Sequence, residues 1–71
     1  MGVLMMLTFG ELVKKARKEL NISQEQLSRE LHVSFSTVNR WENEKSKPNN
    51  ISKKVFYDFC KEKGIDVEEN K

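Results

Sequence analysis

The sequence predicts an all-α fold: a compact bundle of four to five short helices in one domain covering residues 1–71. Start signals for helices recur along the chain, and apolar residues follow each of them at helical spacing. A chain of 71 residues leaves room for one domain at most. We expect the helices at about residues 9–20, 24–31, 35–43 and 50–63.

The first helix has a marked start and a marked end. Thr8 and Glu11 have the spacing of a capping box, in which each side chain binds the backbone amide of the other residue. Leu7 and Leu12 occupy the positions of a hydrophobic staple around this start. Asn21 is suited to the left-handed conformation that ends a helix.

The second and third helices follow with almost no spacer. Ser23 and Gln26 form a second capping box, and Ser34 is placed to cap the third helix. Between the two helices, His32 is expected in a left-handed conformation, which histidine adopts more readily than most residues. Val33 would fill the angle between the helices.

The third and fourth helices each present an apolar side. In the third, Val38 and Trp41 are expected to face the core, and we interpret Trp41 as a core residue. Residues 45–50, KSKPNN, read as a loop. The fourth helix is marked by apolar residues at helical spacing and ends at Gly64; the markers are Ile51, Val55, Phe56, Phe59 and Cys60.

Two short helices joined by a turn of three or four residues make a helix-turn-helix motif. With Val38 and Trp41 turned inward, the third helix is free to expose serine, asparagine and arginine side chains. These groups suit the base edges of the major groove of double-stranded DNA. DNA is therefore the partner that this motif predicts.

Composition narrows the function further. The chain has one cysteine and one histidine, so neither a disulfide framework nor a metal site is expected. No nucleophile–base pair or carboxylate pair is recognisable, and we expect no cofactor and no enzyme activity. Residues 1–54 carry ten basic and six acidic residues, while residues 55–71 carry three and five. This basic body fits a polyanionic partner, and a reducing, cytoplasmic location without membrane association fits the composition.

The stretch LNISQEQLSRELHVSFSTVNRWENEKSKP resembles the Cro/C1-type (XRE-like) helix-turn-helix family of phage repressors and small bacterial regulators. The resemblance covers about residues 8–64. It implies a phage-repressor-like DNA-binding domain, with residues 35–43 as the recognition helix in the major groove. The expected function is then sequence-specific binding of double-stranded DNA in transcription regulation.

The resemblance also implies roles for individual residues. Gln24 matches a residue that binds a DNA phosphate, and Arg17 and Glu42 match an ion pair between the first and third helices. The remaining matches meet bases or the DNA backbone. The full set expected at DNA comprises Ser23, Gln24, Ser34, Phe35, Ser36, Thr37, Asn39, Arg40, Asn43, Lys45 and Lys47.

Some positions depart from the family pattern. His32 stands in place of the usual turn glycine, and Ser28 in place of a small alanine, so its hydroxyl needs a partner. Glu44 replaces a frequent glycine and brings a negative charge to a loop that faces phosphate. Phe35 has two readings: it contacts a thymine methyl group, or it packs down onto the second helix.

Two further questions stay open at the level of sequence. A protein-interaction or adaptor module, such as the antitoxin half of a toxin–antitoxin pair, is the alternative function. An apolar patch formed by residues 3–7 together with Phe35 would favour it. We expect a monomer or a weak homodimer that dimerises on DNA, because little chain is left for the fifth helix on which many relatives dimerise.

Overall fold

Each helix begins at a residue whose side chain caps its first turn. The computed structural model describes residues 7–65 and residue 67, and within them the chain forms helices and no strand. The helices are α1 (Phe9–Leu20), α2 (Gln24–Leu31), α3 (Phe35–Glu42) and α4 (Asn50–Glu62). Their caps are Thr8, Ser23, Ser34 and Asn49, each with extended backbone and each accepting a bond from the amide three residues later. The all-α expectation is confirmed.

The two predicted capping boxes are complete. At the start of α1, the Glu11 amide donates to Thr8 Oγ1 at 3.1 Å, and the Thr8 amide donates back to Glu11 Oε1 at 2.9 Å. At the start of α2, Ser23 and Gln26 exchange the same two bonds at 3.0 and 2.9 Å. Four of the amides that a helix start leaves unpaired are thus satisfied within the local sequence.

The helices also end in a common way. Past the end of each helix lies a residue with positive φ, and the next amide donates to a carbonyl five residues back, as in a Schellman motif. The four left-handed residues are Asn21, His32, Glu44 and Gly64, with φ of 58°, 60°, 60° and 75°. The expected conformations of Asn21 and His32 are confirmed. The α3 and α4 helices end one residue earlier than expected, at Glu42 and Glu62.

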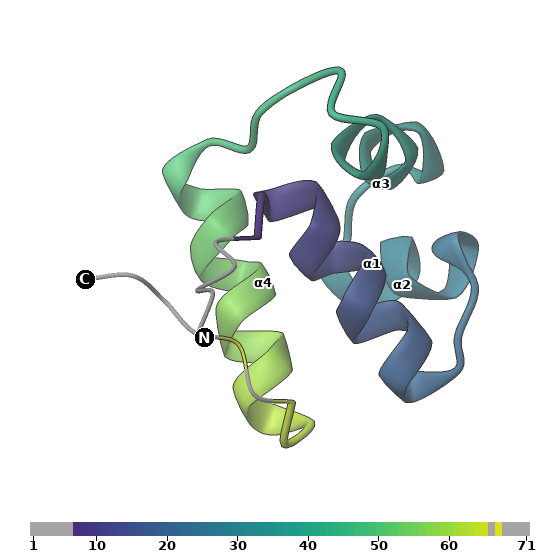
Figure 1. Cartoon of the computed structure of the whole chain (residues 1–71), viewed down its shortest axis with the longest axis vertical. Helices are drawn as coiled ribbons and strands as arrows, with labels where there is room; N and C mark the ends of the chain where they lie inside the picture. Colours follow the sequence, from purple (N-terminus) through teal and green to yellow (C-terminus); the bar gives the residue numbers. More distant parts are fainter. Residues whose placement is uncertain (1–6, 66, 68–71) are drawn as a thin grey trace, which may run out of the picture.

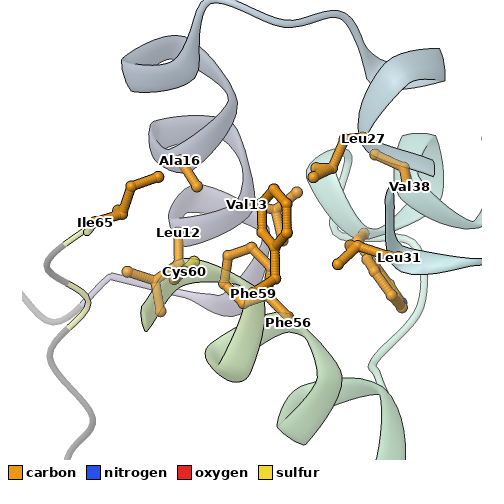
Figure 2. Close-up of a cluster of buried hydrophobic side chains, with 11 residues drawn as sticks. Leu12, Val13, Ala16, Leu27, Leu31, Val38, Phe56, Phe59, Cys60 and Ile65 are labelled. Carbon is orange, nitrogen blue, oxygen red and sulfur yellow. The ribbon is translucent and has the colours of Figure 1, made fainter. Parts of the chain in front are cut away.

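The four helices enclose one core. Helices α2 and α3 pack closely together, α1 packs against α3, and α4 lies against α2 (Figure 1). A loop after α3 passes above the start of α1 in this view and leads into α4 (Figure 1). The core draws buried side chains from every helix (Figure 2): Leu12, Val13, Ala16, Leu27, Leu31, Val38, Trp41, Phe56, Phe59, Cys60 and Ile65.

Trp41 lies in this core as predicted, in an aromatic group that ties three helices together. The ring of Phe9, at the first residue of α1, stands edge-on to Trp41 of α3, with centroids 5.1 Å apart. The same Phe9 ring stands edge-on to Phe56 of α4 at 5.2 Å. Such edge-to-face pairs add to the energy of simple burial.

The apolar side of α4 is narrower than the sequence suggests. Phe56, Phe59 and Cys60 are buried, but Ile51 and Val55 remain 74% and 39% exposed. The interpretation of Ile51 and Val55 as part of the inward side is therefore wrong. The reason is geometric: the core meets α4 along the side of Phe56, Phe59 and Cys60, and the side of Ile51 and Val55 is not covered by it. The expected fifth helix falls on residues 65–71, most of which lie outside the described residues.

Candidate nucleic-acid interface

Two features fix the position of helix α3: the hydrogen-bonded turn that precedes it, and the side chains of α3 that are buried in the core. The Val33 amide donates to the Ser28 carbonyl at 3.0 Å, which fixes the turn between α2 and α3. Ser28 is buried at this contact, and its hydroxyl donates to the Glu25 carbonyl at 2.7 Å, the backbone partner that it needed. On α3 itself, Val38, Trp41 and Glu42 are buried.

The residues predicted to meet DNA fall into two groups by exposure. Most are exposed: Ser23, Ser34, Phe35, Ser36, Arg40, Asn43, Lys45 and Lys47. Three are half-buried: Gln24, Thr37 and Asn39. The exposed group forms the outer side of α3, the start of α2 and the loop after α3. Of the half-buried group, Gln24 and Asn39 lie where α2 and α3 meet, and Thr37 lies in the first turn of α3.

Two serines of the set have a clear structural task. Ser23 Oγ caps α2, and Ser34 Oγ caps α3 by accepting from the Thr37 amide at 3.1 Å. The hydroxyls of Ser34 and Thr37 also share a hydrogen bond of 2.9 Å. Both serine hydroxyls therefore stabilise helix starts, whatever else they contact.

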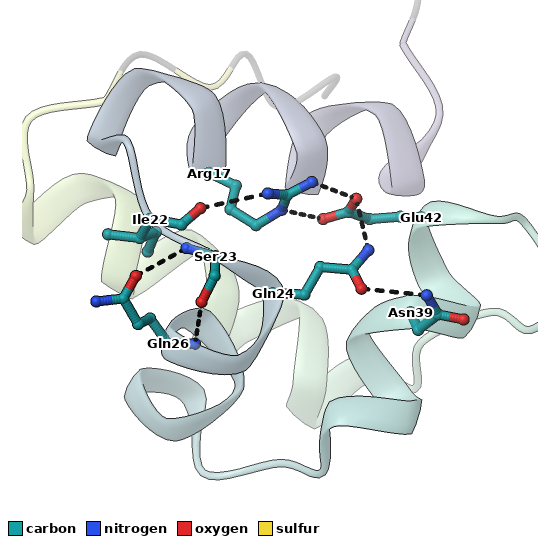
Figure 3. A network of polar contacts seen from close by, with 7 residues as sticks. All are labelled: Arg17, Ile22, Ser23, Gln24, Gln26, Asn39 and Glu42. Carbon is teal, nitrogen blue, oxygen red and sulfur yellow. Dashed lines mark hydrogen bonds and ion pairs between the residues drawn. The ribbon is translucent and has the colours of Figure 1, made fainter.

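An ion pair between α1 and α3 lies behind the exposed side (Figure 3). Arg17 Nε donates to Glu42 Oε2 at 2.7 Å, and Arg17 Nη2 donates to Glu42 Oε1 at 2.9 Å. A third guanidinium nitrogen, Nη1, donates to the Ile22 carbonyl at 3.3 Å. The pair expected from the resemblance is present, in the two-bond geometry that arginine and carboxylate favour.

The electrostatics of the pair follow from its burial. Burial by itself would raise the pKa of the Glu42 carboxyl. Hydrogen bonds from Arg17 and Gln24, together with the positive charges of Arg17 and Lys14, outweigh this, so the pKa is lowered. For Arg17, the hydrogen bond to Glu42 raises the pKa against the opposing effect of burial. Both groups are therefore charged in the folded protein near neutral pH.

The ion pair continues into a row of side-chain amides (Figure 3). Gln24 Nε2 donates to Glu42 Oε1 at 3.0 Å, and Asn39 Nδ2 donates to Gln24 Oε1 at 3.1 Å. Asn43 Nδ2 in turn donates to Asn39 Oδ1 at 3.1 Å. Asn39, expected on the outward side of α3, is half-buried, and its amide is bonded at both ends within the protein. No spacing in the sequence signals this row, since Gln24 and Asn39 meet only once α2 and α3 are docked.

Phe35 lies at the first residue of α3, outside the buried cluster. Its side chain is 50% exposed, whereas the aromatic rings of Phe9, Trp41 and Phe56 pack on one another. This exposure favours the outward reading of Phe35 over packing on α2. An apolar ring is thereby available beside the exposed polar groups Ser36 and Arg40.

Glu44 contacts a part of the molecule that the sequence analysis did not connect with it. Thr8 Oγ1 donates to Glu44 Oε2 at 2.6 Å, although the two residues are 36 positions apart. The carboxylate thus lies at the start of α1, where the partial positive charge of a helix N-terminus favours an anion. The negative charge that was expected to face phosphate is drawn toward α1.

Other expectations fall partly outside the described residues. Of the apolar start, only Leu7 is described, and it is exposed. A shared patch of residues 3–7 with Phe35 therefore lies outside the described part of the chain. Cys60 is buried, and burial raises the pKa of its thiol to about 11, which agrees with an inert core residue. Within the described residues, no His, Cys, Asp or Glu cluster has the arrangement of a metal site.

Comparison with known protein families gives one match. A family model described as helix-turn-helix matches residues 13–52, more than half of the chain. This range runs from the middle of α1 to the start of α4 and includes all of α2 and α3. Neither a curated protein nor a solved structure matches the chain significantly.

Proposed function

The chain belongs to the Cro/C1-type helix-turn-helix family of DNA-binding transcription regulators, and we propose that it recognises a specific sequence of double-stranded DNA by placing α3 in the major groove. The observation that carries this proposal is the outer side of α3. Phe35, Ser36 and Arg40 are exposed there, while Val38, Trp41 and Glu42 fix the helix from behind. A helix held in this way offers side chains to base edges from a rigid support.

Base contacts need a second set of groups that hold the protein on the DNA backbone. Gln24 is the first residue of α2, where helix N-termini favour contact with phosphate. Lys45 and Lys47 are exposed in the loop after α3 and supply positive charge. These residues position the protein, whereas those of α3 specify the sequence.

The proposed function involves neither a cofactor nor catalysis. Recognition of DNA by these side chains requires no cofactor and no catalytic step, so we propose that the protein is not an enzyme. No helix in the described part of the chain is long and apolar enough to cross a membrane. The proposed place of action is the compartment of the regulated DNA, which for the bacterial and phage members of such a family is the cytoplasm.

Selection of bound duplexes from a random DNA pool tests the proposal most directly. We expect a defined preferred site. Arg40→Ala should then weaken binding to that site much more than to scrambled DNA, because a bidentate arginine–guanine contact discriminates by about 1–3 kcal/mol. Lys61→Ala, at an exposed position of α4, is the control and should change the affinity for neither the preferred site nor scrambled DNA. A pool that yields no enriched sequence would contradict the proposal.

The alternative, a protein-interaction module, has one observation in its favour. Ile51 and Val55 are apolar side chains exposed four residues apart on α4. If the selected pool shows no preference and mobility-shift assays show only weak, salt-sensitive binding, this alternative replaces the DNA-reading function.

A further inference from the structure

We infer that Asn39 recognises no base but acts as a positioning residue, which orients Gln24 toward a DNA phosphate through the hydrogen-bonded row Glu42–Gln24–Asn39–Asn43. The inference rests on the proposed function and deepens it, because it makes a half-buried residue of the recognition helix the support of a contact between Gln24 and the DNA backbone. The row is visible in Figure 3 from Glu42 to Asn39.

The direction of the row follows from the chemistry of its buried end. An ionised carboxylate only accepts hydrogen bonds, so the nitrogen of the Gln24 amide, not its oxygen, must face Glu42. The Gln24 oxygen then faces Asn39, which must present its own nitrogen. The Asn39 oxygen in turn receives the nitrogen of Asn43. One buried charge thereby fixes the orientation of three amides.

This orientation leaves a donor where a phosphate needs one. Each amide nitrogen carries two hydrogens, and in this row each uses one of them toward its neighbour. On Gln24, one N–H therefore remains for a further acceptor. Phosphate oxygens only accept, so the remaining donor of Gln24, at the first residue of α2, suits the DNA backbone.

The same bonds argue against Asn39 as a reader of adenine. A bidentate contact with adenine uses the nitrogen and the oxygen of an asparagine amide together. In Asn39 each of these atoms is already held by a protein partner, Gln24 on the nitrogen side and Asn43 on the oxygen side, so the amide plane is fixed within the protein and the side chain is half-buried. Arg40, the next residue, has its side chain exposed and is the better candidate for base contact.

A double-mutant cycle in DNA binding tests the inference. Gln24→Ala, Asn39→Ala and the double variant are measured on the selected site and on scrambled DNA, with Asn50→Ala on α4 as the matched control. We expect Asn39→Ala to weaken both duplexes by a similar factor, about three- to tenfold for one lost hydrogen bond. In the Gln24→Ala background the same change should cost less than twofold, because Asn39 acts through Gln24.

A readout in the free protein complements the cycle. In Asn39→Ala, the side-chain amide resonances of Gln24 should shift and exchange faster with water, while thermal melting remains cooperative. Asn39→Asp, which keeps the shape but lacks the N–H, should weaken binding at least as much as Asn39→Ala.

The outcomes separate the two hypotheses. Loss confined to the selected site, or additive losses in the double variant, would overturn the inference and leave the proposed function standing. Unchanged Gln24 resonances in Asn39→Ala would also overturn it. If the unmodified protein binds no duplex at all, the proposed function fails, and the inference fails with it.

Discussion

Helices α1 and α3 approach each other so closely at Gly10 that no side chain fits between them. Gly10 lies in the first turn of α1, and a Cβ atom there would press directly against the carbonyl oxygen of Trp41. Glu44, which accepts the Thr8 hydroxyl, borders the same spot. The sequence contains only three glycines, and this one is required by close approach, not by its backbone angles.

The first prediction follows from that contact. Gly10→Ala should lower the free energy of unfolding by about 1–3 kcal/mol, the range for overpacking a tight site, although alanine is the better helix former. Urea unfolding followed by circular dichroism measures the change. Lys14→Ala, exposed on the same helix, should alter stability by less than about 0.5 kcal/mol. A Gly10→Ala protein more stable than the parent would mean that α1 does not approach Trp41 so closely.

The turn between α2 and α3 places His32, where glycine is usual, in a left-handed conformation. This residue adopts φ of 60° without being glycine, as do Asn21 and Glu44. A left-handed conformation costs about 1 kcal/mol for a residue with a Cβ atom. His32→Gly should therefore raise the midpoint of thermal unfolding by several degrees. The gain is reduced by the greater freedom of glycine in the unfolded chain. Gly64→Ala, at φ of 75° with open space around it, should act in the opposite direction.

The ion pair between Arg17 of α1 and Glu42 of α3 stabilises the packing of these two helices, and its contribution depends on pH. The pKa of Glu42 is lowered by folding, so its stabilising effect is complete above the unfolded value of about 4.5 and is lost as pH falls through the lower folded value. The pKa of Arg17 is raised, and its contribution is therefore present at all pH values below about 12.

Glu42→Gln should cost about 1–3 kcal/mol at pH 7, because the half-buried Arg17 loses its charged partner but keeps an amide oxygen. The difference between this variant and the parent protein should shrink between pH 5 and pH 3, as the parent carboxyl becomes protonated. Urea unfolding at pH 7, 5, 4 and 3 measures it, with exposed Glu30→Gln as the control. A constant difference across this range would contradict a lowered pKa.

Helix ends and contacts between helices differ in how far the sequence predicts them. Helix starts and ends were predictable, because caps such as Ser23 and Asn21 act through bonds to their nearest neighbours in sequence. Contacts that depend on docking were not. The Gln24–Asn39 bond and the Thr8–Glu44 bond join helices or their ends, and side-chain type alone does not reveal such partners. The exposure of Ile51 was missed for the same reason, since periodicity does not tell which part of an apolar side the other helices cover.

At the scale of the whole molecule, the described chain measures 37 by 26 by 21 Å and has its proposed DNA-binding side on α2, α3 and the following loop. A protein of this size covers one half of a two-fold symmetric site. We therefore expect a monomer or weak dimer in solution that dimerises on DNA, with half-sites about 34 Å apart, or one helical turn. Sedimentation with and without the selected duplex measures this. A tight dimer in the absence of DNA would contradict it.

The distribution of charge over the whole molecule leads to the last prediction. Residues 1–54 hold the excess of basic groups, and among them Lys45 and Lys47 are exposed next to the recognition helix. A lysine that neutralises one phosphate releases condensed counterions, and the slope of log K against log salt concentration changes by about one unit when it is removed. Lys45→Ala should lower the slope by that amount on any duplex. Gln24→Ala should weaken binding with the slope unchanged, because its side chain carries no charge. Lys61→Ala, in the less basic final quarter of the chain, is the control and should change neither the affinity nor the slope. If Lys61→Ala and Lys45→Ala lower the slope equally, the contact with the DNA backbone does not lie in the loop after α3.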